Sequence, residues 1–571
     1  MTAGGTPEVP VAGVLQCLEP IAITKQEQAI EDLQALHAVT SCGLAAQEAA
    51  PHVTAVSVTN QGAQLAFWPP ALCTFTALSS INLSGNAITF IPQSVQALTG
   101  LKVLNLSRNS LTSLPPEVSC LTSLTELDVG RNQLAALPAA LCSLSQLQVL
   151  NAYSNQVQAL PQDFGRLQGL VRLGLKSNRL AELPASFSQL SSLVELFLTD
   201  NQLSTLPEGF GSLASLVKLQ ASFNPFTHLP ADLWQLPELE LFRLAVGELQ
   251  QWPAGLAEAG SLPKLAWCSI GRNPAAVDVP AVPAALPRVE RQALQVGEKL
   301  GQGASGEVFL GTYEGCTVAV KIFIADVSPD GSTAEEMAIN CAVQHPNITR
   351  VLALVTDTQQ QQQQQQGEPA AAAAECGGDA GAVVGLVLEL VQGKPLAGRP
   401  TSQHLLRCKW DADASFSPAA ALRICHGVAS ALAYMHSRGI THGDVYAHNI
   451  MADDHWRPVI CDFGASFCYS AAADPGRFFE RMEVRAFGLF MGDVAARISS
   501  SSSSSSGGGG GGDGAAGAAA EDVVQQLQQV VQQCLAGSAM QRPLFAQLEQ
   551  QLLGLMQQLG VAVATAGEVQ Q

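Results

Sequence analysis

Apolar residues in the first half of the chain recur with a 23-residue period, which neither an isolated strand nor a single helix produces. Each unit follows the pattern LxxLxLxxNxLxxLP, as in the stretch from Leu101 to Pro115. The alternation of Leu104 and Leu106 predicts a short strand with both side chains facing inward. The asparagine at the bend is expected to pair its side-chain amide with backbone groups that the turn leaves unsatisfied. Because one unit cannot bury its leucines alone, the pattern predicts a stacked solenoid with an internal asparagine ladder. The repeated asparagines are Asn86, Asn109, Asn132, Asn155, Asn178, Asn201 and Asn224.

This motif resembles the cytoplasmic 23-residue class of leucine-rich repeats. The resemblance implies an α/β solenoid of horseshoe shape over residues 53–273. We expect an N-terminal cap at 1–52, with a helical segment from Gln16 to Ala50. At the other end, Gly247 replaces the asparagine, and the next asparagine, Asn273, follows only after 26 residues. The array is therefore expected to end there.

The strand positions between the inward leucines carry polar and aromatic side chains, which we expect to be exposed on the concave face. One interpretation is a binding surface for an unknown protein ligand, and the other is an ordinary solvated sheet. The sequence leaves both open. The residues are Glu126, Asp128, Tyr153, Arg172, Lys176, Glu195 and Phe197.

The hydrophobic pattern changes after the repeats. Residues 274–288 are rich in proline and are predicted to be an extended linker. The remainder, 289–560, has the size of a second domain and is followed by a tail at 561–571. Two tracts of low complexity, 357–381 and 499–520, are predicted to be disordered surface inserts, because neither can bury enough apolar area to offset chain entropy.

Composition and charge argue against nucleic acid and membranes as binding partners of this chain. The net charge of −19 leaves no basic field for nucleic acid or for anionic lipid. The 14 cysteines form no paired CxxC sets, and the first residues lack the basic start and apolar run of a signal peptide. No uninterrupted apolar stretch is long enough to cross a membrane. We therefore expect a cytoplasmic protein that binds neither nucleic acid nor membrane.

A glycine-rich segment, LGQGASGEV, runs from Leu300 to Val308 between two β-like stretches. Its glycines would let backbone amides approach phosphate oxygens, although a plain hairpin is the more common explanation of such a segment taken alone. The downstream order of motifs resolves this ambiguity. VAVK at 318–321, HPNI at 345–348, HGDVYAHN at 442–449 and DFG at 462–464 follow in turn, and CLAGSAMQRPLF lies near the end.

In this order the motifs resemble the eukaryotic protein-kinase family, and the whole chain is similar to plant and green-algal leucine-rich-repeat kinases without a transmembrane segment. The resemblance implies an α+β bilobal kinase domain that uses ATP and Mg²⁺. Lys321 would bind the α- and β-phosphates with Glu336 as its ion-pair partner, Glu335 being the alternative. Asp444 would orient the substrate hydroxyl, and Asn449 and Asp462 would hold the metal. The ATP site would be formed by Leu300, Gly301, Gly303, Gly306, Val308, Ala319, Lys321, Leu388, Glu389 and Val391.

The second half also departs from the family pattern. Gly443 stands where the catalytic loop usually has arginine, and Tyr446 replaces the lysine that contacts the γ-phosphate, although His448 could substitute in part. There is no Ala-Pro-Glu motif, and EVRAFG from Glu483 is expected to replace the usual Asp-x-x-x-x-Gly start of the large C-lobe helix. Because Gly443 cannot clamp a phosphate, we do not expect activation by phosphorylation of the segment after DFG.

Two functions therefore remain after the sequence analysis. The first is an active protein kinase of serine/threonine type, acting on protein hydroxyls, whose repeats bind a substrate or a regulator. The second is a pseudokinase scaffold that keeps the fold for protein interaction alone. The presence of Lys321, Glu336, Asp444, Asn449 and Asp462 favours the first, because a scaffold has no chemical need for all five.

Overall fold

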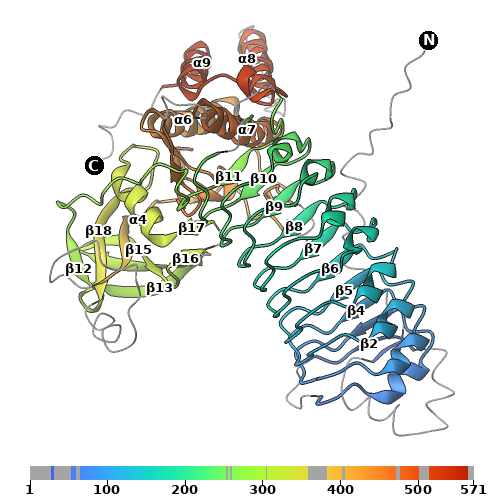
Figure 1. The fold of residues 1–571 in the computed structure, drawn as a ribbon. Coiled ribbons are helices and arrows are strands. Elements are labelled where there is room, and N and C mark those ends of the chain that lie inside the picture. Colours follow the sequence, from blue (N-terminus) through green and yellow to red (C-terminus); the bar gives the residue numbers. More distant parts are fainter. Residues whose placement is uncertain are drawn as a thin grey trace, which may run out of the picture. The chain divides into compact units, whose positions relative to one another are not determined.

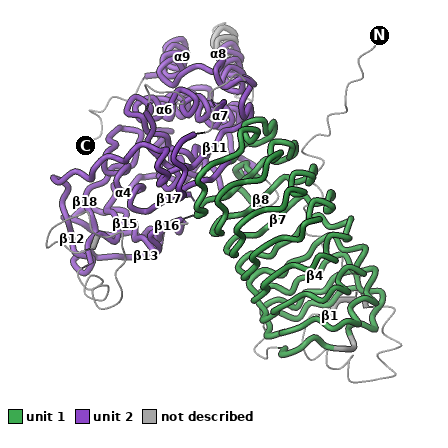
Figure 2. Tube along the Cα trace, viewed as in Figure 1, with its two compact units in different colours: residues 1–241, 399–409 green, residues 242–398, 410–571 purple. Residues whose placement is uncertain are grey.

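The computed structural model describes residues 28–30, 53–59, 65–252, 255–256, 260–303, 305–328, 330–357, 382–401, 405–470, 476–499 and 513–562. It divides into two compact units, 1–241 with 399–409 and 242–398 with 410–571 (Figure 2). Apart from Gln28–Ile30, which form a strand and not part of a helix, the predicted cap lies outside the described residues. So do most of the two inserts and most of the tail.

The first unit is built from strands that pair in parallel and in chain order from β2 to β9 (Figure 1). From β3 to β9, each strand is followed by a 3₁₀ helix on the return. The strands are β1 (Gln28–Ile30), β2 (Val53–Ser57), β3 (Ser80–Asn82), β4 (Val103–Asn105), β5 (Glu126–Asp128), β6 (Val149–Asn151), β7 (Arg172–Gly174), β8 (Glu195–Phe197) and β9 (Lys218–Gln220). The 3₁₀ helices are η2 (Pro70–Thr74), η3 (Gln93–Ala97), η4 (Pro116–Cys120), η5 (Ala139–Ser143), η6 (Phe164–Arg166), η7 (Ala185–Gln189), η8 (Phe210–Ser212) and η9 (Ala231–Gln235).

The predicted asparagine ladder is present in this unit. Asn109 donates its amide to the carbonyls of Leu83 at 2.9 Å and Leu106 at 3.0 Å, and its Oδ1 accepts from the backbone N–H of Ile88 at 2.9 Å. The residue before it, Arg108, has a left-handed backbone with φ of 56°. That turn directs carbonyl groups into the interior, where only an amide side chain of this length satisfies them. The leucine-rich solenoid predicted from the period is therefore confirmed.

One prediction about the strand face is wrong. Glu195 is buried, with 2% of its surface exposed, because its carboxylate lies between two cations. Arg172 Nε is 2.8 Å from Glu195 Oε2, and Lys218 Nζ is 3.9 Å from Oε1. Both cations also lie over the ring of Phe197, at 5.5 and 5.1 Å from its centroid. This part of the face is an ordered charge cluster rather than a row of independent solvated side chains.

The second unit begins inside the last repeats and not at the predicted linker. Strand β10 (Leu241–Arg243) crosses the border between the units, and β11 (Trp267–Ser269) lies beside helix α7 (Gly476–Ala495) of the second unit (Figure 1). The terminal repeats therefore share a compact unit with the C-terminal half of the chain. The proline-rich stretch 274–288 is mostly exposed, with turns at 274–276 and 284–286. Its Val282 and Leu286 pack against the apolar cluster of Leu354 and Leu386. Its assignment as a linker between domains stays a prediction.

A mixed six-stranded sheet and a set of helices form the rest of this unit. The strand order of the sheet is β12-β18-β19-β15-β14-β13. Its members are β12 (Arg288–Glu290), β13 (Gln295–Gln302), β14 (Gly306–Tyr313), β15 (Cys316–Phe323), β18 (Val351–Asp357) and β19 (Ala382–Glu389). The shorter strands are β16 (Val327–Ser328), β17 (Gly331–Ser332), β20 (Lys394–Pro395), β21 (Ile440–Thr441), β22 (Ile450–Ala452), β23 (Pro458–Ile460) and β24 (Phe467–Cys468). The helices are α4 (Thr333–Ala342), α6 (Pro418–Ser437), α7, α8 (Asp513–Cys534) and α9 (Phe545–Gln558), with 3₁₀ turns η10 (Arg291–Ala293), η11 (Ala447–Asn449) and η12 (Ala539–Gln541).

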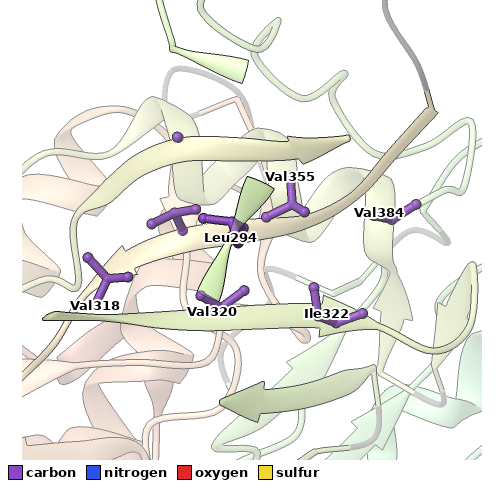
Figure 3. Packing of buried hydrophobic residues seen from close by; sticks show 8 residues of the cluster. Leu294, Val318, Val320, Ile322, Val355 and Val384 are labelled. Atoms are coloured by element: carbon purple, nitrogen blue, oxygen red, sulfur yellow. The ribbon is translucent and has the colours of Figure 1, made fainter. Parts of the chain in front are cut away.

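The sheet separates two sets of side chains. Val318, Val320 and Ile322 alternate along β15 toward one face, where they pack with Leu294 and Val355 (Figure 3). The residues between them point to the opposite face. Helix α4 contributes Cys341 to a second apolar cluster with Leu354 and Leu386. The mixture of sheet and helices agrees with the α+β class expected for the second half.

Helix α8 starts earlier than the sequence pattern predicts. Residues 513–520 belong to the predicted disordered insert, yet they form the first two turns of this helix. Alanine, the strongest helix former, makes up most of this stretch. Low complexity was therefore a misleading signal at these positions.

Candidate functional site

Lys321 lies on β15 and faces away from the core shown in Figure 3. In the antiparallel register it is opposite Val308 on β14 and Leu386 on β19, while Ala319 is opposite Leu388. Directly opposed residues share a face of a sheet, and so do residues two apart on one strand. Val308, Ala319, Lys321 and Leu388, four residues of the predicted ATP site, are therefore on one face.

Helix α4 supplies the partner of Lys321. Of the two candidate glutamates, Glu336 makes the ion pair and hydrogen bond with the Lys321 ammonium, and both side chains are buried. Glu335 instead accepts a hydrogen bond from the backbone N–H of Arg272 at 3.1 Å. Asp462 Oδ1 is 3.6 Å from Lys321 Nζ. Burial alone would lower the pKa of Lys321, but the charges of Asp462 and Glu336 outweigh it and raise that pKa, so the side chain stays a cation.

The glycine-rich segment is the tip of a hairpin between β13 and β14, with Gly301 opposite Val308. Gly306 is required here for packing, because a Cβ would lie 2.4 Å from the carbonyl oxygen of Ile322. At Gly301 a Cβ would meet nothing within 4 Å. The other predicted residues of this region, Leu300 and Gly303, belong to the same hairpin.

The predicted catalytic loop brings Asp444 and Asn449 together. The Asn449 amide donates to the backbone carbonyl of Asp444 at 2.9 Å and to its Oδ2 at 2.8 Å. The N–H of Cys461 donates to the carbonyl of Asn449 at 2.9 Å, so the loop lies against the residue that precedes Asp462. Asp462 has a left-handed backbone with φ of 65°. Strained conformations of this kind concentrate at functional sites.

Glu483 anchors the loop from helix α7. Its Oε2 accepts from the N–H of His442 at 3.1 Å and lies 2.8 Å from His436 Nε2, and its Oε1 accepts from the N–H of Gly443 at 2.5 Å. Burial alone would raise the pKa of Glu483, but the contacts with His436, His442 and Gly443 lower it below its ordinary value. The expectation that EVRAFG begins this helix is wrong, because α7 starts at Gly476 and Glu483 lies inside it.

The segment after DFG offers buried hydroxyls. Ser466 donates its hydroxyl to the carbonyl of His442 at 2.9 Å. The hydroxyl of Tyr469 is 2.8 Å from His436 Nδ1, and burial raises the pKa of this phenol. Both side chains hold the segment against the catalytic loop and are little exposed.

Arg243 and Trp267 also lie at this site, and no motif in the sequence predicts either of them. Arg243 Nη2 is 2.6 Å from Asp444 Oδ1. The indole of Trp267 stacks on Tyr446 with ring centroids 4.4 Å apart and an interplanar angle of 6°. Only weak features of the sequence point to these two residues. Both occupy outward positions of repeat strands, and the loop has Gly443 where an arginine is usual, so a cation from elsewhere could lie there.

Comparisons with known proteins agree with these two architectures. The family model of the protein kinase domain matches residues 294–481, and two leucine-rich-repeat models match 76–134 and 139–266. Regions that match leucine-rich repeats are thus followed in this chain by a region that matches the protein kinase domain. The match to the protein kinase domain begins at residue 294, one residue before strand β13 of the glycine-rich hairpin.

The curated relatives of this chain are distant and match only in part. A probable serine/threonine-protein kinase of Dictyostelium discoideum is 23% identical over 205 residues, which cover 30% of this chain and 23% of that protein. Another from the same organism, drkD, is 34% identical over 33% of this chain and 13% of that protein. PkaB, a serine/threonine-protein kinase of Streptomyces coelicolor, is 27% identical over 27% of this chain and 30% of that protein. The chain therefore spans under a third of the length of each.

Among solved structures, a leucine-rich-repeat protein of Leptospira interrogans is 28% identical with a TM-score of 0.38, over 40% of this chain and 57% of that one. In the part of this chain that the structure describes, no helix combines the length and the apolar character needed to span a bilayer.

The donor set of the kinase domain suits a magnesium ion. Asp462 offers a carboxylate whose side chain is 38% exposed. Asn449 directs its amide nitrogen at Asp444, so its amide oxygen is the atom left to bind a cation. Hard divalent cations prefer such oxygen ligands. The residues present therefore fit the metal that the family uses.

Proposed function

We propose that this protein is an ATP-dependent protein kinase of serine/threonine type whose leucine-rich repeats bind a protein substrate or regulator. The observation that carries the proposal is the combination of the Lys321–Glu336 pair and Asp462 with the Asp444–Asn449 pair in one domain. These are the charges that phosphoryl transfer requires, namely a fixed cation, oxygen ligands for a metal and a carboxylate for the nucleophile.

In the proposed reaction, a serine or threonine oxygen of the substrate forms a bond with the γ-phosphorus of ATP. The bond from that phosphorus to the β,γ-bridging oxygen breaks, and ADP leaves with the electron pair. Asp444 accepts the hydrogen bond of the attacking hydroxyl and takes its proton as the new bond forms. Lys321, held by Glu336, places a positive charge against the phosphate oxygens.

Mg²⁺, bound through Asp462 and Asn449, would neutralise negative charge on the β- and γ-phosphates. The apolar face formed by Val308, Ala319 and Leu388 would cover the adenine ring. The N–H of Glu389 already donates to the carbonyl of Arg350 at 2.9 Å. The backbone atom of Glu389 that would contact adenine is therefore its carbonyl oxygen. The backbone of Val391, two residues on, would supply the second contact.

A phosphate-transfer assay with labelled ATP, Mg²⁺ and a generic protein substrate tests the proposal. We expect transfer by the wild type and a loss of about 100-fold or more in Lys321→Met, since removing a preorganised charge costs about 3 kcal/mol in barrier. Lys394→Met, the same substitution at an exposed lysine on β20, is the matched control and should retain wild-type activity. Equal turnover of the Lys321 variant and the wild type would contradict the site.

The second candidate function is a pseudokinase scaffold, and it is favoured by Gly443 and Tyr446 in place of the usual basic residues. The two functions differ in nucleotide chemistry. If the protein is an enzyme, Mg²⁺-ATP should raise its melting temperature, and Asp462→Asn should remove the part of that shift which depends on Mg²⁺. A protein that shows neither transfer nor a metal-dependent shift is a scaffold.

For the repeats, we propose that the ligand binds the strand face around Phe197, where Arg172 and Lys218 flank an aromatic ring. Aromatic residues and arginine are enriched in protein interfaces. A photo-crosslinking residue at position 197 should capture the substrate or regulator, and one at the exposed Gln189 of η7 should not. Equal capture at both positions would exclude a specific site on this face.

A further inference from the structure

Arg243 is the third residue of strand β10 and belongs to the same compact unit as the kinase domain. Only 3% of its surface is exposed, which is unusual for the most strongly hydrated class of side chain. None of the strands β3 to β9 has a basic residue at the equivalent position of the repeat. The residues at that position are Asn82, Asn105, Asp128, Asn151, Gly174, Phe197 and Gln220.

Two hydrogen-bond acceptors and one further carboxylate surround the Arg243 guanidinium. Nη2 donates to Asp444 Oδ1 at 2.6 Å and Nη1 donates to the carbonyl of Gly443 at 3.2 Å. Nε lies 3.0 Å from Asp330 Oδ1, as an ion pair without a hydrogen bond. A buried charge is tolerated only when opposite charges and hydrogen bonds compensate the loss of water, and this environment supplies both. Burial alone would lower the pKa of Arg243, but Asp330 and Asp444 outweigh it and raise that pKa, so the cation is permanent.

The neighbouring repeat strand independently contacts the same loop. Beside its stack on Tyr446, Trp267 donates its indole N–H to the carbonyl of Val445 at 3.2 Å. Gly443 has φ of 75°, and a Cβ there would lie 2.3 Å from the carbonyl oxygen of Ala465 and 2.9 Å from that of Cys268. The two departures from the family pattern, Gly443 and Tyr446, are thus the residues that fit against β10 and β11.

The Asp444 carboxylate is held at both oxygens, by Arg243 at Oδ1 and by Asn449 at Oδ2. Two fixed donors on different oxygens prevent the carboxylate from rotating. A carboxylate has about four lone-pair positions, so two remain for a substrate hydroxyl. The Asp444 side chain is 22% exposed, which is compatible with access from solvent.

We propose that Arg243 is a positioning residue for the catalytic aspartate, supplied by the terminal repeat strand in place of the arginine that the loop lacks at Gly443. This inference rests on the proposed kinase function. It makes strand β10 part of the catalytic apparatus rather than of a separate binding module. Phosphotransfer then depends on a contact between segments 201 positions apart in the sequence.

The test compares four full-length proteins: the wild type, Arg243→Met, Arg243→Lys and Arg485→Met. Arg485 is the matched control, because it also joins a repeat segment to helix α7, through the carbonyl of Lys264 at 3.0 Å, without touching Asp444. We expect kcat to fall about 100-fold in Arg243→Met with an unchanged KM for ATP, because a misplaced base affects only the reacting geometry. Arg243→Lys keeps the charge and should recover part of kcat, whereas Arg485→Met should keep the wild-type kcat.

Hydrogen exchange of the amides in 443–449 separates this inference from the proposed function. If the wild type transfers no phosphate, the kinase proposal fails, and faster exchange in Arg243→Met than in Arg485→Met still identifies Arg243 as the residue that holds the loop. Unchanged kcat and unchanged exchange in a folded Arg243→Met protein would overturn the inference. An increase in kcat would also overturn it, since Arg243 would then restrain Asp444 instead of supporting it. Should Arg243→Met not fold, kcat and the amide exchange of 443–449 are compared between Arg243→Lys and Arg485→Met. A lower kcat and faster exchange in Arg243→Lys support the inference, and equal values in the two variants overturn it.

Discussion

At the scale of single residues, the predicted catalytic loop is organised by charges that enter it from other elements. Glu483 of helix α7 accepts from two backbone amides of the loop and contacts His436 of helix α6, and Arg243 holds Asp444 from a repeat strand. Both are nearly inaccessible to solvent. Because buried charges without partners are costly, removing either one is expected to disturb the loop more than removing any exposed charge nearby.

Glu483→Gln should weaken this anchor and change the response to acid. A carboxylate whose folded pKa is below its ordinary value of 4.5 stabilises the fold above that pH, and the contribution is lost as the pH falls through the folded pKa. The variant should be about 2 kcal/mol less stable at pH 7, the value of hydrogen bonds to a charged group. It should also lose less stability than the wild type between pH 5 and pH 3, roughly the range over which carboxylates protonate. Urea denaturation at each pH measures this, and parallel curves for the two proteins would contradict it.

At the scale of elements, the ladder asparagines and the strand-face residues behave differently although both are polar. Asn132 donates to the carbonyls of Leu106 and Val129, both at 3.0 Å, and accepts from the N–H of Leu111 at 2.9 Å. Asn105, on the strand face, bonds only locally to Ser107 and is half-buried. One residue type therefore has a structural role at the bend and a surface role on the strand.

Asn132→Ala should consequently destabilise the repeats by about 3 kcal/mol, since the buried N–H of Leu111 loses its acceptor and the carbonyls of Leu106 and Val129 each lose one of two amide donors. Asn105→Ala, the same substitution on the strand face, should cost less than about 1 kcal/mol. Equilibrium unfolding in urea, followed by circular dichroism, provides the comparison. Equal losses for the two variants would show that the ladder adds nothing beyond the local turn.

At the scale of the whole molecule, the exposed stretch 274–288 does not coincide with the border between the compact units. Within the second unit, the segment before this stretch is contacted by side chains of the C-terminal half, and one of its own side chains contacts that half in return. Arg542 donates to the carbonyl of Pro263, and Arg485 to that of Lys264. Trp252 meets the ring of Phe479 at 5.7 Å.

Limited proteolysis within 274–288 should therefore cut the chain without separating its pieces. We expect two bands on a denaturing gel but a single peak on gel filtration, because the contacts of residues 242–273 survive the cut. A chain that begins at residue 289 should be poorly stable, and one that begins at 242 should be stable. Dissociation of the nicked protein under native conditions would instead support the predicted linker as a true domain boundary.

The amino-acid sequence by itself determined the two architectures and the main charged residues of the candidate site. The 23-residue period encodes the solenoid because every unit repeats the same local strand, bend and return. The ordered motifs predicted that Lys321, Glu336, Asp444, Asn449 and Asp462 belong together because their spacing follows one fold. Local patterns of this kind can be read without knowing which distant segments meet.

Only the tertiary structure decided what contacts Asp444 and where the second compact unit begins. Arg243 and Asp444 are 201 positions apart, and no periodicity or motif links a repeat strand to a catalytic loop. Gly443 and Tyr446 read in sequence as losses, yet in the fold they provide the space and the aromatic ring against which Cys268 and Trp267 pack. The physical reason is that packing between elements depends on shape and charge brought together by folding, which the linear pattern of polar and apolar residues does not contain.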